Sequence, residues 1–258
     1  MDLVAQRKDV TTALLSEDAA PGLRILTINR PEKLNSLNSA VFSRLEEEVG
    51  RLETSDDVGC VVLRGAGRAF SAGHDLGDIG DGESFGHLRW QSRIVERLAN
   101  LPQPVIAAVH GPCFTGALEL ALAADLIVAS EAARFADTHA KWGLTPIWGM
   151  SQRLPRRVGG SRARDMMFTC RTVDGREGAA IGLADRCFPD ATFADDVMAL
   201  SKAILANSRF SNAANKRLLL QTDGLSLRDG LAFEVFRNEG NAPDVAERIA
   251  AFARAKKR

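Results

Sequence analysis

Cysteine is scarce in this chain of 258 residues, which contains only Cys60, Cys113, Cys170 and Cys187. No two of them form a CxxC pair, and their scatter excludes a disulfide framework of the kind found in small secreted domains. A cysteine-based zinc or redox site is equally disfavoured. We therefore expect a reducing environment and a cytoplasmic location.

The chain also lacks an excess of charge and a long apolar run. Lysine and arginine number 33, as do aspartate and glutamate, so neither nucleic acid nor an anionic membrane is an expected partner. The longest apolar stretch, 116–129, is interrupted by Glu119 and Asp125 and is too short to span a bilayer. The first nine residues do not have the basic and then apolar order of a secretory signal, so none is expected.

Hydrophobic periodicity predicts an α/β fold. The pattern predicts strands over 10–15, 23–29, 59–65, 104–109 and 126–129, and helices over 39–53, 88–101 and 116–123. A turn is expected over 18–22, and Asn38 or Ser39 as the N-cap of the first helix. Strands that alternate with helices imply a mostly parallel sheet. After about residue 160 the pattern becomes mostly helical. We expect an α/β core over 1–190, followed by a helical region over 191–258.

Two glycine-containing turns follow buried strands, over 65–76 and 110–120. Ligands bind at such strand ends in α/β sheets, and small residues allow close approach to backbone amides. A helix that begins near Gly116 would point free N–H groups at an anion. Two such turns side by side would supply two donors to one oxygen, which is an oxyanion hole.

Several ordered segments resemble the enoyl-CoA hydratase/isomerase (crotonase) superfamily. They are NRPEKLNSL at 29–37, GRAFSAGHDL at 67–76, PVIAAVHGPCFTGALELALAAD at 104–125, ARF at 133–135 and SQRL at 151–154. The resemblance covers nearly the whole chain. It implies a superhelix of ββα units and a C-terminal region, 191–258, that assembles a homotrimer or homohexamer.

The resemblance further implies an enzyme acting on an acyl-coenzyme A thioester, with no separate cofactor and no metal. The family's oxyanion hole falls on the backbone amides of His74 and Gly116. The expected acyl-CoA contacts are Lys33, Leu34, Ser36, Ala72, Gly73, His74, Asp75, Leu76 and Gly116. Only the amide of His74 is expected to take part in the chemistry, and Asp75 is expected to hold its loop. His87 lies in a variable stretch that often closes over the acyl pocket in this family.

The catalytic pair departs from the two glutamates of the family's hydratases. Glu119 matches the first, whereas His139 stands where the second belongs. An imidazole can give or take a proton near neutral pH, so His139 remains a candidate acid or base. Asp137 would orient His139 if the segment is extended, but not if it is helical. Burial would raise the pKa of Glu119 and the helix N-terminus would lower it.

These observations favour hydration of a trans-2-enoyl-CoA, a lyase reaction with Glu119 and His139 sharing the proton transfers. Double-bond isomerisation and thioester hydrolysis on the same scaffold remain alternatives. So does an acyl-CoA-binding protein without catalytic activity, because the second glutamate is replaced. Ile147 occupies the position of the extra acid of the dienoyl-CoA isomerases, which disfavours that reaction.

Overall fold

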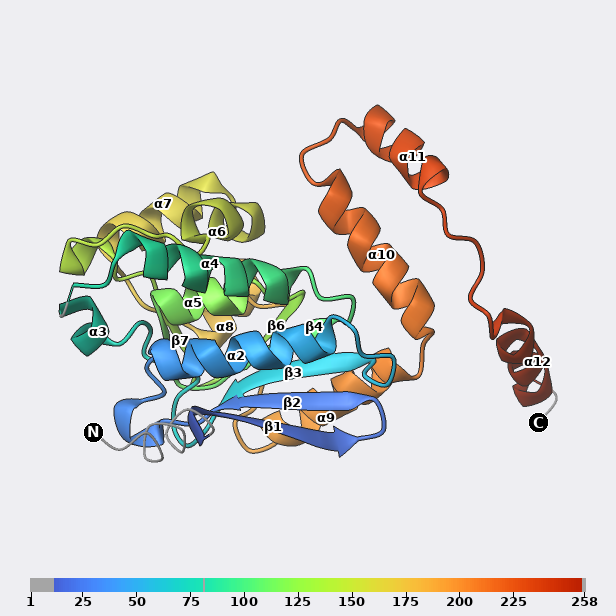
Figure 1. Cartoon of the computed structure of the whole chain (residues 1–258), viewed down its shortest axis with the longest axis horizontal. Coiled ribbons are helices and arrows are strands. Elements are labelled where there is room, and N and C mark those ends of the chain that lie inside the picture. Colours follow the sequence, from blue (N-terminus) through green and yellow to red (C-terminus); the bar gives the residue numbers. More distant parts are fainter. Residues whose placement is uncertain (1–11, 81, 257–258) are drawn as a thin grey trace.

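The computed structural model describes residues 12–80 and 82–256. It is built on a six-stranded sheet, and Figure 1 shows the twist of its strands. The strand order is β1-β2-β3-β4-β6-β9. All neighbours pair in parallel except β1 and β2, which form an antiparallel hairpin. The strands are β1 (Leu14–Ala20), β2 (Leu23–Ile28), β3 (Cys60–Gly65), β4 (Val105–Val109), β6 (Leu126–Ser130) and β9 (Arg186–Phe188).

A second sheet of three short strands lies beside the first, in the order β5-β7-β8. Its members are β5 (Pro112–Phe114), β7 (Arg134–Ala136) and β8 (Val173–Asp174). Each of β4 and β6 is followed by a short strand of this second sheet and then by helical structure. The repeated ββα succession and the mostly parallel main sheet confirm the predicted fold class.

Helices cover both faces of the main sheet and make up most of the C-terminal part. They are α2 (Ser39–Leu52), α3 (Leu76–Gly80), α4 (Phe85–Ala99), α5 (Gly116–Leu122), α6 (Met150–Val158), α7 (Gly160–Thr169), α8 (Gly175–Ala180), α9 (Phe193–Leu205), α10 (Arg209–Thr222), α11 (Leu227–Phe236) and α12 (Val245–Ala255), with 3-10 turns η1 (Pro31–Lys33) and η2 (Ala140–Trp142). Among the described residues, no helix has the length and apolarity needed to cross a bilayer.

The core has two parts, one on each face of the main sheet. Helices α2, α4 and α5 fill the larger part, in which the predicted apolar face of α2 (Val41, Leu45, Val49 and Leu52) is buried. Asn38 caps α2 by accepting a hydrogen bond from the Val41 amide at 3.1 Å, as the sequence predicted. On the opposite face α9 packs Val197 and Leu200 against the strands. The layers hold the carboxyl ends of β3 and β4 in a fixed register.

Three local predictions need correction. The predicted strand 10–15 lies partly outside the described residues, and β1 begins at Leu14 and continues to Ala20. The expected five-residue turn is therefore only Pro21-Gly22, because Ala20 pairs with Leu23 and Gly22 adopts φ +79°. The region after residue 160 also contains β8 and β9, since pairing with β7 and β6 makes strands of segments too short to show a period.

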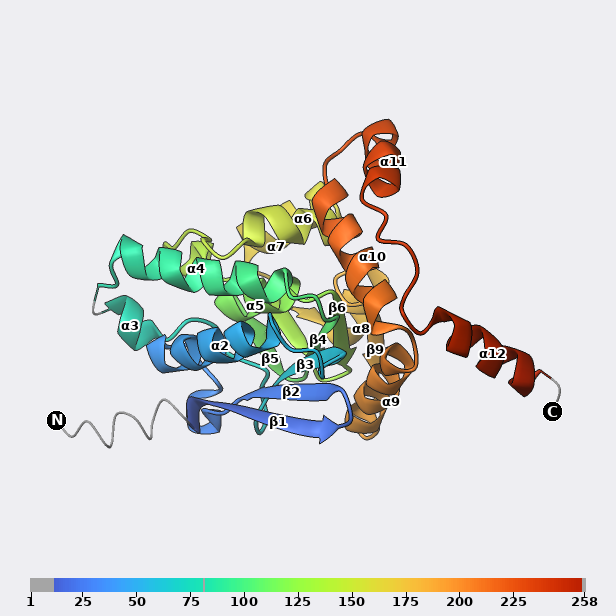
Figure 2. The ribbon, with the colours of Figure 1, turned by 45° about the vertical axis from the view of Figure 1, so that its right-hand side comes forward.

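The C-terminal helices α10, α11 and α12 extend away from the sheet, as Figures 1 and 2 show. Helix α10 is fixed to the body by Lys216, whose buried Nζ donates to Asp125 Oδ2 at 2.7 Å and to the Gln103 carbonyl at 3.0 Å. Beyond this anchor, large apolar side chains face solvent. They are Leu219, Leu220, Leu225, Leu227, Leu231, Val235, Phe236, Ile249 and Phe252.

Candidate active site

The two predicted glycine turns lie side by side at the carboxyl ends of β3 and β4. The Ser71 amide donates to the Pro112 carbonyl at 3.0 Å, and the Phe114 amide donates to the Ser71 carbonyl at 3.3 Å. Gly73 adopts φ +103°, and a Cβ there would lie 2.6 Å from the Phe114 carbonyl oxygen and 3.6 Å from the Gly116 nitrogen. Only glycine permits this approach of the two turns.

The amides of His74 and Gly116 are therefore brought close together. Gly116 begins α5, and Thr115 before it adopts φ +52°, so the chain turns sharply into the helix. The hydrogen bonds found within residues 12–80 and 82–256 include none donated by either amide. The Leu37 amide and carbonyl hold the residues on either side of His74, through contacts of 2.8 and 2.9 Å. Within the described residues, both amides therefore lack an acceptor.

Glu119 lies in the first turn of α5 with its carboxylate buried. Oε1 accepts hydrogen bonds from the amides of Trp148 and Met150, each at 2.9 Å. Oε2 faces His139, at 3.6 Å from Nε2. Burial raises the pKa of Glu119, and the two amides and His139 only partly offset this effect. The sequence alone could not tell whether the pKa of Glu119 is raised or lowered; in the structure burial has the largest effect, and the pKa is raised.

His139 is held by Asp137 on the side away from Glu119. Asp137 Oδ1 lies 2.6 Å from Nδ1 of His139 and also accepts from the His139 amide at 3.1 Å. The predicted pairing forms although His139 itself has helical φ and ψ, because Asp137 lies just past the end of β7. This short side-chain turn fixes the imidazole with Nε2 toward Glu119.

A cavity of about 510 Å³ opens in front of Glu119, His139 and the two amides. Its walls are mainly apolar, and the ring of Trp148 lies 4.9 Å from that of His74. The lining residues are His74, Gly82, Glu83, Phe85, Leu88, Thr115, Gly116, Glu119, His139, Leu144, Thr145, Pro146, Ile147 and Trp148. The volume suits a small organic group.

The remaining predicted binding residues lie around the first glycine turn. Ala72 donates its amide to the Leu34 carbonyl at 2.9 Å, while Lys33 and Leu76 are exposed. Ser36 Oγ and Arg30 both donate to Asp75 Oδ2, at 2.9 and 2.8 Å, and Asp75 Oδ1 accepts from the Gly77 amide. Asp75 therefore holds its loop, as expected. Contacts of these residues with coenzyme A stay a prediction.

Two features of the site were not predicted from the sequence. The amides of Trp148 and Met150 fix Glu119, and a backbone donor gives no residue-type signal. Glu83 brings a second carboxyl group into the cavity from the variable stretch before α4. No motif includes it, and only the polar composition around His87 could have drawn attention to this stretch.

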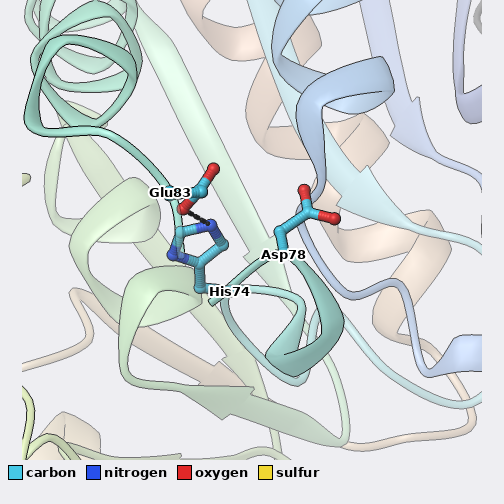
Figure 3. A group of neighbouring side chains, drawn as sticks. All are labelled: His74, Asp78 and Glu83. Carbon is cyan, nitrogen blue, oxygen red and sulfur yellow. Dashed lines mark ion pairs between the residues drawn. The ribbon is translucent and has the colours of Figure 1, made fainter. Parts of the chain in front are cut away.

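One group of described side chains could be considered for a metal, namely His74, Asp78 and Glu83, whose nearest ligand atoms lie within 4.8 Å of one another (Figure 3). His74 Nε2 and Glu83 Oε2 are 2.8 Å apart. Two ligands on a tetrahedral zinc ion at bond lengths of about 2.0–2.1 Å lie roughly 3.3 Å apart. Asp78 Oδ2 already accepts from the Ser39 amide at 3.2 Å. The side chains of His74 and Glu83 would have to move apart to bind a cation.

Comparison with known proteins identifies the family. The sequence model of the enoyl-CoA hydratase/isomerase family matches residues 18–257. The 1,2-epoxyphenylacetyl-CoA isomerase of Escherichia coli is 32% identical over 240 residues, which are 90% of this chain and 92% of the relative.

Two solved structures support membership of the same family. The enoyl-CoA hydratase from Bacillus anthracis superposes with a TM-score of 0.88 at 28% identity, covering 94% of this chain and 96% of that one. A monofunctional enoyl-CoA isomerase from M. smegmatis gives 0.74 at 35% identity, covering 86% and 99%. The chain therefore belongs to the enoyl-CoA hydratase/isomerase family, within the crotonase superfamily.

Proposed function

We propose that this protein is an enoyl-CoA hydratase that adds water to a trans-2-enoyl-CoA. The observation that carries the proposal is the buried Glu119 carboxylate, whose free oxygen lies 3.6 Å from His139 Nε2 beside two unused backbone amides. Two groups able to exchange protons face one cavity, and the amides would bind the thioester oxygen. The family supports an acyl-CoA substrate.

The proposed reaction begins with the thioester oxygen bound by the amides of His74 and Gly116. Glu119 orients a water molecule and takes its proton as the oxygen attacks the β-carbon. Charge builds on the thioester oxygen as the enolate forms, and each amide donor stabilises it by about 3–4 kcal/mol. Protonated His139 then donates its Nε2 proton to the α-carbon. The proton on Glu119 returns to His139, so the net change is the addition of one water molecule.

The surroundings of the pair fit these roles. The raised pKa of Glu119 makes its carboxylate a stronger base than one exposed to water. The amides of Trp148 and Met150 occupy Oε1 and direct Oε2 toward the cavity. The Asp137 carboxylate, 2.6 Å from Nδ1, would prevent rotation of the His139 ring and keep Nε2 toward Glu119.

Isomerisation is the second candidate, because the relative from E. coli and the structure from M. smegmatis both carry isomerase names. The same pair could take a proton from the α-carbon and return it elsewhere on the chain. Hydration adds a water molecule to the substrate and isomerisation does not, so the masses of the products distinguish the two reactions. Hydration adds the mass of water, isomerisation leaves the mass unchanged, and hydrolysis of the thioester would release a free thiol.

The test uses crotonyl-CoA and a longer trans-2-enoyl-CoA, with absorbance of the conjugated enoyl group and product mass as readouts. We expect the absorbance to fall as a water adduct forms. The variants Glu119→Gln and His139→Ala should each lower kcat by roughly 10²–10⁴-fold, the contribution typical of a general acid or base. Glu47→Gln, a change on the exposed face of α2, serves as the control. Unchanged turnover in Glu119→Gln would refute the assignment.

A further inference from the structure

Glu119 and His139 form one polar wall of the cavity, and His74 and Glu83 form a second. His74 Nε2 and Glu83 Oε2 point toward one another at 2.8 Å, whereas Asp78 lies to one side (Figure 3). The two atoms are not aligned as a hydrogen bond. Both are buried and have no hydrogen-bond partner among the described residues. A buried polar atom without a partner costs about 1–3 kcal/mol, so this wall is built at a cost to stability.

Neighbouring side chains hold Glu83 in place. Gln91 Nε2 donates to Glu83 Oε1 at 2.9 Å, and His87 Nε2 lies 3.2 Å from the same oxygen. His87 is in turn 3.1 Å from Ser39 Oγ on α2. These contacts use Oε1 and leave Oε2 free toward His74. The carboxyl group is thus positioned by two helices.

The imidazole of His74 is neutral in this environment. Burial lowers the pKa of His74 to about 4, an effect that outweighs the nearby Asp78 and Asp75. Burial also raises the pKa of Glu83. The contact is therefore one between a carboxyl group and an uncharged ring, which offers one hydrogen-bond donor and several acceptors. Around it the cavity is apolar, with Phe85, Leu88 and Ile147 among its walls.

We propose that His74 and Glu83 bind a hydroxyl group on the acyl chain, so that the preferred substrates are hydroxylated acyl-CoA thioesters. This inference rests on the proposed function, because it places an acyl chain in the cavity. A hydroxyl group can donate to Glu83 and accept from His74 at once. A substrate carboxylate would be repelled by the Glu83 carboxylate.

His74 contributes both its backbone amide and its side chain, and this limits where on the acyl chain the hydroxyl group lies. Its amide is one of the two proposed donors to the thioester oxygen, and its side chain forms the polar wall. The bound hydroxyl must therefore lie within the first few carbons beyond the β-carbon. The new hydroxyl of the hydration product is on the β-carbon itself, where it faces Glu119 and His139 instead.

Binding of saturated acyl-CoA thioesters tests this inference without requiring turnover. Titration calorimetry would compare butanoyl-, pentanoyl- and hexanoyl-CoA with their ω-hydroxy counterparts. For at least one chain length we expect the hydroxylated member to bind about tenfold or more tightly, the ratio that corresponds to about 1.4 kcal/mol. In Glu83→Leu this preference should fall to within about twofold. The variant Glu83→Gln keeps the shape of the side chain, and it should lose most of the preference if Glu83→Leu fails to fold.

Glu47→Leu is the matched control, because Glu47 is an exposed glutamate of α2 that pairs only with Arg44 among the described residues. It should keep the full preference. Equal affinities within every pair in the wild type, or a preference unchanged in both Glu83 variants, would overturn the inference while leaving acyl-CoA binding intact. Failure of every thioester to bind would instead refute the proposed function, and the inference with it.

Discussion

At the scale of single residues, the candidate site is a chain of contacts from Asp137 through His139 to Glu119. The sequence predicted Glu119 from a family motif and His139 from its place where the family's second glutamate belongs. It offered Asp137 from its spacing of two residues before His139, with the pairing conditional on an extended segment. The distances could not be predicted, since they depend on the end of β7 and on the amides of Trp148 and Met150. Glu83 escaped prediction entirely, because it belongs to no motif and reaches the cavity only through the packing of α4.

Replacing Asp137 by asparagine tests whether this carboxylate positions His139. The change preserves size but removes the charge 2.6 Å from Nδ1. We expect kcat for hydration to fall roughly 10²-fold or more, because the imidazole loses its fixed tautomer and a charged partner. KM should change little, since Asp137 is buried behind His139. Steady-state kinetics with crotonyl-CoA gives both values, and a change in KM alone would contradict the positioning role.

The raised pKa of Glu119 predicts a pH-dependent effect on stability. Because the folded-state pKa lies above the unfolded value, ionisation of Glu119 subtracts from stability as pH rises through the folded pKa. Glu119→Gln removes this penalty. The variant should therefore have a higher Tm than the wild type at alkaline pH, and the difference should shrink as pH falls. Thermal unfolding followed by circular dichroism between about pH 5 and pH 9 measures it; a difference independent of pH would contradict the assignment.

At the scale of elements, the sequence predicted the bounds of the buried strands and helices best. Strands β3, β4 and β6 and helices α2 and α5 lie within a few residues of their predicted bounds. The pairing of β3 with β4 is what brings the two glycine turns together. The three-residue strands β5, β7 and β9 could not be foreseen, because segments so short show no periodicity and exist only through their neighbours.

Gly73→Ala tests the contact between the two turns. The new Cβ would lie 2.6 Å from the Phe114 carbonyl oxygen, so the turns must separate and the two amides cannot meet one oxygen. We expect kcat to fall by about 10²–10³-fold, as for loss of an oxyanion-hole donor. Gly224→Ala is the matched control, because Gly224 also has a positive φ of +81° but a Cβ there would meet no atom of the described residues within 4 Å. Similar activity losses in both variants would show that backbone strain, not the contact, is responsible.

At the scale of the whole molecule, the C-terminal helices do not pack like the rest of the chain. The sequence predicted helices after residue 190 but not their separation from the body. Helix α9 covers the sheet, whereas α10–α12 extend outward and expose Leu227, Val235 and Phe236 by about four-fifths of their surface. Periodicity reveals that a helix has an apolar face but not which surface covers it.

We propose that copies of this chain cover that apolar surface in a homotrimer or a hexamer of two trimers. Exposed apolar area of this extent is typical of an assembly interface. Light scattering coupled to size-exclusion chromatography should give about three or six times the chain mass of 27.8 kDa. Introducing aspartate at both Val235 and Phe236 should shift the protein toward smaller species. A monomer in the unaltered protein would contradict the proposed assembly.

The proposed role of Glu119 and His139 is tested most directly by hydration of crotonyl-CoA in water labelled with heavy oxygen, with mass analysis of the product. The product should be a 3-hydroxyacyl-CoA that carries the label on the β-carbon with the thioester intact, and Glu119→Gln and His139→Ala should each slow its formation by roughly 10²–10⁴-fold. Release of free thiol, an unlabelled product of unchanged mass, or formation of the labelled product by either variant at the wild-type rate would contradict the claim that Glu119 and His139 together add water to the enoyl group.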